Sequence, residues 1–244
     1  MRKRMLVCGM LFALSAVFLS GCVGINFSPY EPVAWGSDSE AVTQSYHVGA
    51  YDAVSLSGGF SVVYTAAEEC AVSIGAWEEL LQYITVTVDN GVLKADMERT
   101  FNGRVPVLYL SAPTLNALSV SGATSLTECD TIRGDAFLLD ISGAGDFELD
   151  LDVDFFEMKS AGASSVRLSG SARTAAIDIS GASDISAFDL VTQTAAVNIS
   201  GIGSCDIYCS GTLDIDISGA GSLRYRGDPS IHQDISAIAS VSKG

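Results

Sequence analysis

The chain has 244 residues and is strongly acidic, with 13 Lys and Arg against 29 Asp and Glu and a formal net charge of −16. This charge excludes nucleic acid as a partner, because surfaces that bind DNA or RNA carry clustered positive charge. It favours solubility, limits self-association and repels anionic lipid headgroups.

The first 21 residues have the pattern of an export signal. A basic start at residues 2–4 precedes an apolar run over residues 6–18, which is too short for a stable membrane span. The segment leads into Leu19-Ser20-Gly21-Cys22, which resembles the bacterial lipobox, where small residues precede a cysteine that is acylated and becomes the mature N-terminus. We expect a firm lipid anchor at Cys22, because several acyl chains hold a protein more stably than one. An ordinary secretory signal with a chance cysteine is the alternative.

The segment after the anchor predicts a tether. Residues 22–45 include Pro29, Pro32 and Gly36 and show no hydrophobic periodicity, so we expect a flexible link between the lipid and a folded domain. No later stretch is long and apolar enough to span a membrane. The sequence therefore predicts an exported lipoprotein at the outer membrane or the cell surface.

Residues 46–113 predict an irregular start of the folded domain. Apolar and polar residues begin to alternate near Tyr51, and residues 77–82 suit one or two helical turns. Residues 84–95 predict two strands joined by a tight turn at Asp89-Asn90-Gly91. A solenoid needs an atypical terminal unit that covers its open end, so we interpret this region as an N-terminal cap with the first, longer coils.

A Ser-Gly-Ala phrase recurs through the more regular residues 114–244, and the steps between its middle residues range from 18 to 21. The phrase and its variants are Ser121-Gly122-Ala123, Ser142-Gly143-Ala144, Ala161-Gly162-Ala163, Ser180-Gly181-Ala182, Ser200-Gly201-Ile202, Ser218-Gly219-Ala220 and Ser236-Ala237-Ile238. A fixed period near 20 residues indicates stacked structural units. The small residues predict a sharp turn with a positive φ at the glycine.

Each repeat alternates apolar and polar residues on both sides of its glycine, the pattern of strands with one buried face. A unit of about 19 residues is too short for a propeller blade and fits one coil of a parallel β-helix. We therefore predict an all-β fold, a parallel β-helix (solenoid) with coils of about 19 residues, apolar columns inside and glycines at one corner. A β-sandwich of short strands explains the alternation but not the constant period.

A polar column stands two residues before the first residue of each phrase. Its members are Ser119, Asp140, Lys159, Asp178, Asn198, Asp216 and Asp234. Alternation directs these side chains outward, and we define the acidic ladder as Asp140, Asp178, Asn198, Asp216 and Asp234. Like charges opposite each other on neighbouring strands destabilise by up to ~1 kcal/mol. The alternatives are screening by solvent, protonation of one partner, and a weak Ca²⁺ site; no other metal or cofactor is expected.

Four cysteines remain after Cys8 leaves with the signal and Cys22 is acylated: Cys70, Cys129, Cys205 and Cys209. Four cysteines in an exported protein suggest disulfides. Cys205 and Cys209, however, lie four residues apart on one predicted strand, about 13 Å, whereas a disulfide needs Cα atoms within about 7 Å. We therefore expect buried free thiols and no metal centre.

No group of residues in the sequence has the spacing of a catalytic site, so we do not predict an enzyme. His47 and His232 have no Ser or Cys partner at a recognisable spacing, and both are expected at the surface. Arg224 and Arg226 share one side of a predicted strand, yet no arginine occupies the next coil.

Four features carry a resemblance to a known family. They are Tyr51 to Phe60 (YDAVSLSGGF), Asp89 to Leu93 (DNGVL), Leu108 to Leu115 (LYLSAPTL) and the Ser-Gly-Ala phrases. Residues 46–244 resemble the putative auto-transporter adhesin head domain family of the GIN type, a domain of unknown function in exported proteins of Bacteroidetes-like bacteria. The resemblance implies a right-handed β-helix behind a lipobox. It implies no catalytic residues.

These observations predict an exported, lipid-anchored β-helix that acts as a binding, adhesion or structural module at the cell envelope. The lipid at Cys22 would anchor the protein to the membrane, and an outward sheet of residues 115–244 would bind a glycan or an envelope protein. A polysaccharide-degrading lyase or hydrolase is an alternative that rests on fold analogy alone. A self-associating structural envelope protein is a third.

Overall fold

The structure is a computed structural model that describes residues 41–99, 105–236 and 239–244. The export signal, Cys22 and residues 22–40 lie outside the described residues. The elements are β1 (Ala41–Tyr46), β2 (Ala53–Ser57), β3 (Gly59–Ala66), β4 (Ala71–Trp77), α1 (Glu78–Leu81), β5 (Ile84–Asp89), β6 (Val92–Met97), β7 (Val107–Ala112), β8 (Ala117–Val120), β9 (Ala123–Cys129), β10 (Ile132–Ile141), β11 (Ala144–Ser160), β12 (Ala163–Ile179), β13 (Ala182–Ile199), β14 (Ile202–Ile217), β15 (Ala220–Arg226), β16 (Ser230–Ile235) and β17 (Ser240–Lys243). In this described part, no helix is long and apolar enough to cross a membrane.

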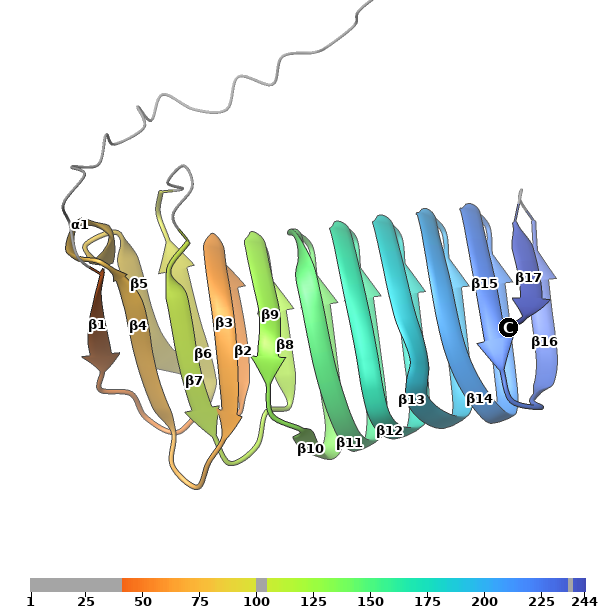
Figure 1. Ribbon diagram of the computed structural model, residues 1–244, viewed down its shortest axis with the longest axis horizontal. Coiled ribbons are helices and arrows are strands. Elements are labelled where there is room, and N and C mark those ends of the chain that lie inside the picture. The colour runs from red at the N-terminus through yellow and green to blue at the C-terminus, as the bar shows by residue number, and fades with distance from the viewer. Residues whose placement is uncertain (1–40, 100–104, 237–238) are drawn as a thin grey trace, which may run out of the picture. The chain divides into compact units, whose positions relative to one another are not determined.

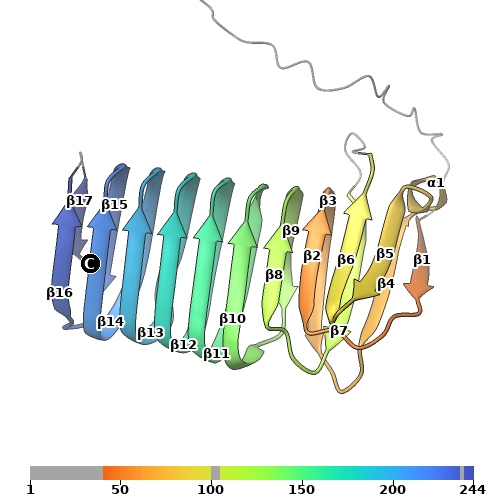
Figure 2. The same cartoon turned by 180° about the vertical axis from the view of Figure 1, so that it is seen from behind.

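The strands form a right-handed parallel β-solenoid of about seven turns, with two flattened faces (Figures 1 and 2). The first face holds the strands that lead into each Ser-Gly-Ala corner, and the second face holds the strands that leave it. The long strands β11 to β14 run down the second face, bend at the opposite corner and return along the first face. From β8 onward every pairing is parallel, so Ile177 lies between Met158 and Val197 of the adjacent coils. The predicted fold is confirmed, and the β-sandwich alternative is wrong.

Two apolar columns fill the interior beside the Ser-Gly-Ala corner. On the first face they include Val120, Ile141, Ile179, Ile199 and Ile217, and on the second face Leu126, Phe147, Val166, Ile185, Cys205 and Leu223; all are at most 2% exposed. Burial of each Val, Leu, Ile or Phe side chain contributes about 1.5–3 kcal/mol, so these columns contribute substantially to stability. In the last coil the column is less covered, since Ile235 is 37% exposed.

The corner glycines have a different physical cause from the one expected. Gly122, Gly143, Gly162, Gly181 and Gly201 do not have positive φ, so the prediction of left-handed turns is wrong for them. Each instead lies directly against the backbone of the preceding coil. A Cβ on Gly162 would lie 2.7 Å from the carbonyl carbon of Gly143 and closer still to its oxygen. Glycine is needed because two backbones meet at this corner.

The serines of the phrases join one coil to the next through hydrogen bonds. The hydroxyl of Ser121 donates to the Leu56 carbonyl at 3.2 Å, and that of Ser142 donates to the Val120 carbonyl at 3.2 Å. These carbonyls also accept the backbone N–H of the same serine. The hydroxyl of Ser180 makes the same kind of contact, with the Ser160 carbonyl at 3.4 Å, whereas Ser200 and Ser218 join the coils through their backbone N–H groups.

The N-terminal region is an irregular cap, as predicted, but its coils are not stacked in chain order. The first coil, β2–β3, is flanked on one side by β6 and β7 and on the other by β8 and β9. The later segment β4–α1–β5 therefore lies farther out than the coil that precedes it in the chain (Figure 1). The hairpin β5–β6 is confirmed, with Asn90 at φ 51° and Gly91 at φ 79° forming its turn.

The predicted tether ends earlier than expected. Residues 41–45 belong to β1, which pairs antiparallel with β4, so the boundary at residue 45 is wrong. The reason is that β4 offers an edge beyond β7, and a short segment rich in β-forming residues satisfies its open backbone groups. Tyr46, at the end of β1, packs against the core.

The four cysteines within the described residues are free thiols. Cys205 and Cys209 are buried at alternate inward positions of β14, and Cys70 and Cys129 are half-buried. Burial raises the pKa of Cys205 to about 12, with Asp206 adding to the effect. Burial likewise raises the pKa of Cys129 to about 12, with Asp130 and Asp150 adding to it.

We expect the free energy of unfolding to fall as the pH rises from about 9 to about 12. In the unfolded chain these thiols ionise near pH 8.5, whereas the folded chain keeps their protons until about pH 12, so the unfolded state binds fewer protons in this range. Urea unfolding across this pH range measures the slope. Cys205→Ala is expected to make it shallower. An unchanged slope in that variant would contradict the assignment to Cys205.

Candidate functional site

The outward carboxylates of one coil are matched by hydrogen-bond donors on the next. On β11 and β12 the matched pairs are Glu148 with Arg167, Asp150 with Ser169, Asp152 with Ser171 and Asp154 with Arg173. The distances are 3.0 Å from Ser169 to Asp150, 3.2 Å from Ser171 to Asp152 and 3.2 Å from Arg173 Nε to Asp154. This arrangement offsets the repulsion that stacked acids would otherwise cause.

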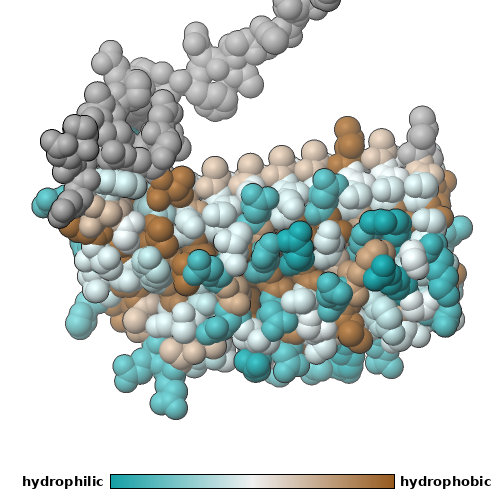
Figure 3. All heavy atoms as spheres, viewed as in Figure 1, coloured by the Kyte–Doolittle hydropathy of each residue, from teal (hydrophilic) through white to brown (hydrophobic). Residues whose placement is uncertain are grey.

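The same pattern continues toward the C-terminal coils. Asn198 donates to Asp178 at 2.7 Å, Ser204 donates to Asp184 at 2.6 Å, and His232 lies 3.1 Å from Asp214. In the sequence each pair is an acid followed by a donor 18 to 20 residues later. On the second face, polar side chains are interspersed with apolar ones, and a row of small apolar residues follows the Ser-Gly-Ala edge (Figure 3). Within that row Ile202 protrudes, with 69% of its surface exposed.

The residues of the acidic ladder lie at equivalent positions of successive coils, as the repeat predicts. Asp140 and Asp178 lie on either side of Lys159, and Asn198 lies between Asp178 and Asp216. Lys159 forms an ion pair with Glu157 at 2.6 Å; this contact, together with Asp140 and Asp178, raises the pKa of Lys159. A cation and an amide thus interrupt the run of carboxylates.

The last ladder pair, Asp216 and Asp234, lies on adjacent strands with both side chains exposed. Within the described residues, no group of three or more His, Cys, Asp or Glu side chains has the arrangement to hold a metal ion. The Ca²⁺ interpretation of the acidic ladder stays a prediction.

A groove follows the corner opposite the Ser-Gly-Ala edge, and we call it the corner groove. Its volume is about 430 Å³, and it crosses coils from β10 to β14. Its lining residues are Gly134, Asp152, Val153, Asp154, Ser171, Ala172, Arg173, Val191, Thr192, Gln193 and Ser210. Small residues such as Gly134, Ala172 and Ser210 leave the hollow open, while longer charged side chains border it.

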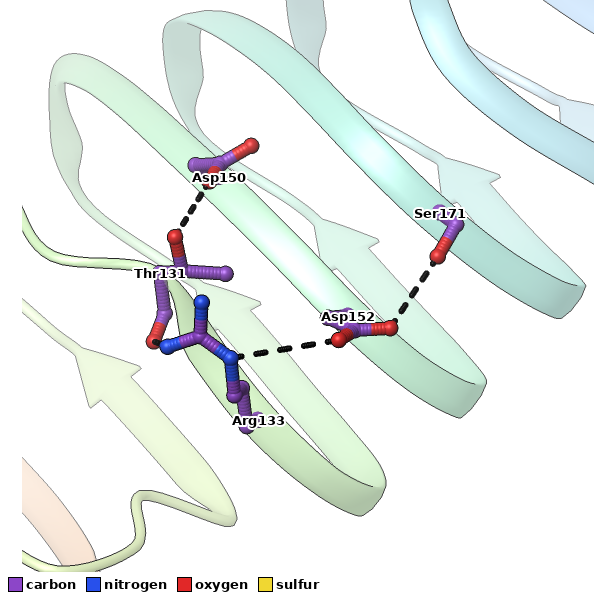
Figure 4. A network of polar contacts seen from close by, with 5 residues as sticks. All are labelled: Thr131, Arg133, Asp150, Asp152 and Ser171. Atoms are coloured by element: carbon purple, nitrogen blue, oxygen red, sulfur yellow. Dashed lines mark hydrogen bonds and ion pairs between the residues drawn. The ribbon is translucent and has the colours of Figure 1, made fainter.

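Polar groups in and beside the corner groove contact one another. Figure 4 shows Asp152 between Arg133, at 3.9 Å, and Ser171, with Thr131 donating to the neighbouring Asp150 at 2.5 Å. Farther along, Arg173 is held by Asp154, and the Thr192 hydroxyl donates to the Tyr208 carbonyl at 2.6 Å. These contacts orient the carboxylates, guanidinium groups and hydroxyls before any ligand arrives.

Two residues of the corner groove remain open to a ligand. Val191 has 54% of its surface exposed, which gives the groove an apolar spot. The Gln193 side chain is exposed, and its amide makes no hydrogen bond to the described part of the chain. The groove therefore offers planar polar groups beside a small apolar surface.

Sequence reasoning did not single out the corner groove. It predicted that a partner would bind an outward sheet, whereas the corner groove lies at the bend and is lined by residues from five strands. A signal was present: Arg133, Asp152 and Ser171 are spaced by 19 residues, as are Asp154 and Arg173.

The fold is shared with solved structures from Bacteroides and Parabacteroides. A putative adhesin from Bacteroides fragilis matches with a TM-score of 0.78 and 20% identity, over 84% of this chain and 98% of that one. A putative adhesin from Parabacteroides merdae matches with a TM-score of 0.65 and 18% identity, over 84% and 96%. A putative lipid binding protein from Parabacteroides distasonis matches with a TM-score of 0.57 and 20% identity, over 84% and 96%. At these identities the likeness shows a common fold.

Among curated proteins none matches this chain significantly. A family model does match, over residues 50–229, and its description is putative auto-transporter adhesin, head GIN domain. The match covers most of the folded domain, from the strand before the first coil corner to the start of the last coil. The chain therefore belongs to the family of the putative auto-transporter adhesin head GIN domain.

Proposed function

We propose that this chain is an exported, lipid-anchored binding module of the cell envelope that holds a glycan chain in the corner groove. The observation that carries the proposal is the run of pre-oriented carboxylate, guanidinium, amide and hydroxyl groups across successive coils. The adhesin description of the family is in keeping with a surface that binds, and it lends no support to a polysaccharide-degrading enzyme.

The chemistry of the corner groove suits sugar hydroxyls. Asp and Arg side chains present two donors or acceptors in one plane, and adjacent hydroxyls of a sugar can meet both. Val191 offers an apolar contact for the face of a sugar ring. A volume of about 430 Å³ lies in the range of small-molecule sites and suits a short stretch of a longer chain.

Two other ligands fit less well. One structural neighbour is described as a putative lipid binding protein, but the corner groove of this chain is bordered by charged side chains, which an acyl chain would have to desolvate. A polyanionic glycan would meet a protein of net charge −16. A neutral glycan avoids both costs.

We expect Asp152→Asn and Arg173→Gln each to weaken glycan binding about tenfold or more, because each removes a charge-assisted hydrogen bond. The measurement is binding of the purified lipoprotein, in detergent micelles, to an array of neutral and acidic glycans. Asp178→Asn is the matched control, since Asp178 lies on the first face away from the groove and also accepts one hydrogen bond across coils. An equal loss in Asp178→Asn, or no binding to any glycan, would count against the proposal.

A further inference from the structure

A second surface feature lies at the C-terminal end of the second face. In β13 the regular ladder is interrupted: Ala187 lies opposite Ile207, but the next paired residue is Val191, opposite Tyr208. Residues 188–190 therefore have no partner on β14, although Asp189 and Leu190 still pair with β12. This places the half-buried Phe188 ring beside β15, two strands away in the stack.

Two arginines of β15 lie against the Phe188 ring. The guanidinium carbon of Arg226 is 4.0 Å from the ring centroid, and that of Arg224 is 5.5 Å away. Both distances are within the range of a cation–π interaction. The ring thus brings two positive groups together on a protein whose net charge is −16.

The two arginines differ in their partners. Arg224 donates through Nε to Asp206 at 2.7 Å and also through Nη2 to the same carboxylate. Arg226 has no carboxylate within ion-pair distance in the described part of the chain. By contrast, a carboxylate lies within ion-pair distance of each of Lys94, Arg133, Lys159, Arg167, Arg173, Arg224 and Lys243. Arg226 is therefore a cation held in place by a ring, with its N–H groups open to solvent.

We propose that Arg226, stacked on Phe188 and next to Arg224, binds a phosphate group. A guanidinium that stacks on an aromatic face keeps its N–H groups free, because they point outward in its own plane. Two of these N–H groups match two oxygens of a phosphate. Holding Arg226 on the ring lowers the conformational entropy lost on binding. The second guanidinium offsets the charge of Asp206. The phosphate is either free or part of a phosphodiester headgroup.

The test is a titration of the purified lipoprotein in detergent micelles, followed by NMR of the arginine Nε–H signals. The probes are inorganic phosphate, glycerophosphoglycerol as a soluble phosphodiester, and acetate. We expect a saturable shift of the Arg226 signal with phosphate or the phosphodiester and a much weaker one with acetate. The tighter of the two phosphate probes identifies the source.

Variants separate this site from the corner groove. Arg226→Gln is expected to weaken phosphate binding about tenfold or more. Phe188→Leu keeps the charge of Arg226 but removes the ring that holds it, and it is expected to weaken binding less. Arg173→Gln, in the corner groove, is expected to leave it unchanged. No shift at Arg226, equal binding of acetate, or an equal response of all arginines would overturn the proposal. If the Arg226→Gln variant still binds glycan, the phosphate site and the corner groove are independent sites.

Discussion

Replacing Gly162 by alanine is expected to lower the free energy of unfolding by at least about 3 kcal/mol, the upper range for overpacking a close contact. The added Cβ would lie 2.7 Å from the Gly143 carbonyl carbon, and backbone atoms cannot rotate away as a side chain can. The same corner carries the hydrogen bond from the Ala163 N–H to the Gly143 carbonyl, at 3.0 Å. The methyl group of the alanine would therefore force the two coils apart at a point where a backbone hydrogen bond joins them.

The matched control is Gly49→Ala. Gly49 lies before the first coil, has no positive φ, and has no atom within 4 Å of the position its Cβ would take. There alanine is expected to be neutral or to stabilise by up to about 1 kcal/mol, because it restricts the unfolded chain. Thermal unfolding followed by circular dichroism measures both. A melting temperature for Gly162→Ala within about 2 °C of that of Gly49→Ala would refute the close-contact explanation.

The repeat was enough to predict the fold because each coil makes the same contacts as its neighbours. A constant period aligns equivalent residues on adjacent strands, so Asp140, Lys159 and Asp178 had to meet in one column, and they do. The hairpin at Asn90-Gly91 was likewise predictable, because its turn requires residues that tolerate positive φ.

The order of the first coils was not predictable from local pattern. Nothing in the alternation of β2 and β3 indicates that β8 pairs on one side and β6 on the other. That choice depends on which apolar surface the segment β4–α1–β5 covers, with Leu80 of α1 fully buried. Long-range packing, rather than propensity, decides it.

The corner groove was missed for a related reason. Alternation assigns a side chain to the inside or outside of a strand, but it does not tell where a long strand bends. At the bend of β11 and β12, Asp154 and Arg173 border a hollow, whereas Glu148 and Arg167 pair on the open second face. The two pairs have the same spacing in the sequence and differ only in the curvature of the strands on which they lie.

Residue size is also matched between neighbouring coils. A substitution that breaks this match is expected to have a second large effect on the free energy of unfolding. Gly203 and Gly221 lie beside Ile179 and Ile199 of the coils before them, and a Cβ there would come within 3.2 and 2.9 Å of an isoleucine methyl group. One coil has Ser160 in the isoleucine column, and a serine, Ser183, then occupies the position of the glycine. In these three cases an isoleucine is matched with a glycine and the smaller Ser160 with a serine.

Ser160 also belongs to a buried triangle of hydroxyl groups. Its Oγ is 2.7 Å from that of Ser183 and 3.1 Å from that of Ser164, and Ser164 donates to Ser183 at 3.0 Å. All three side chains are buried. The triangle satisfies polar groups that would otherwise each cost about 1–3 kcal/mol in the apolar interior.

Ser160→Ile is therefore expected to destabilise the protein by roughly 2–5 kcal/mol, although it increases apolar burial, because it overpacks the interior and removes two of the three hydrogen bonds of the triangle. The triple variant Ser160→Ile, Ser164→Gly, Ser183→Gly copies the isoleucine–glycine arrangement of the coils that follow. It is expected to recover all but about 1–2 kcal/mol, the cost of two glycines in strands. Urea unfolding measures each variant, and Ser160→Ala separates lost hydrogen bonding from overpacking. If the triple variant is no more stable than Ser160→Ile alone, size matching between coils is not what selects serine here.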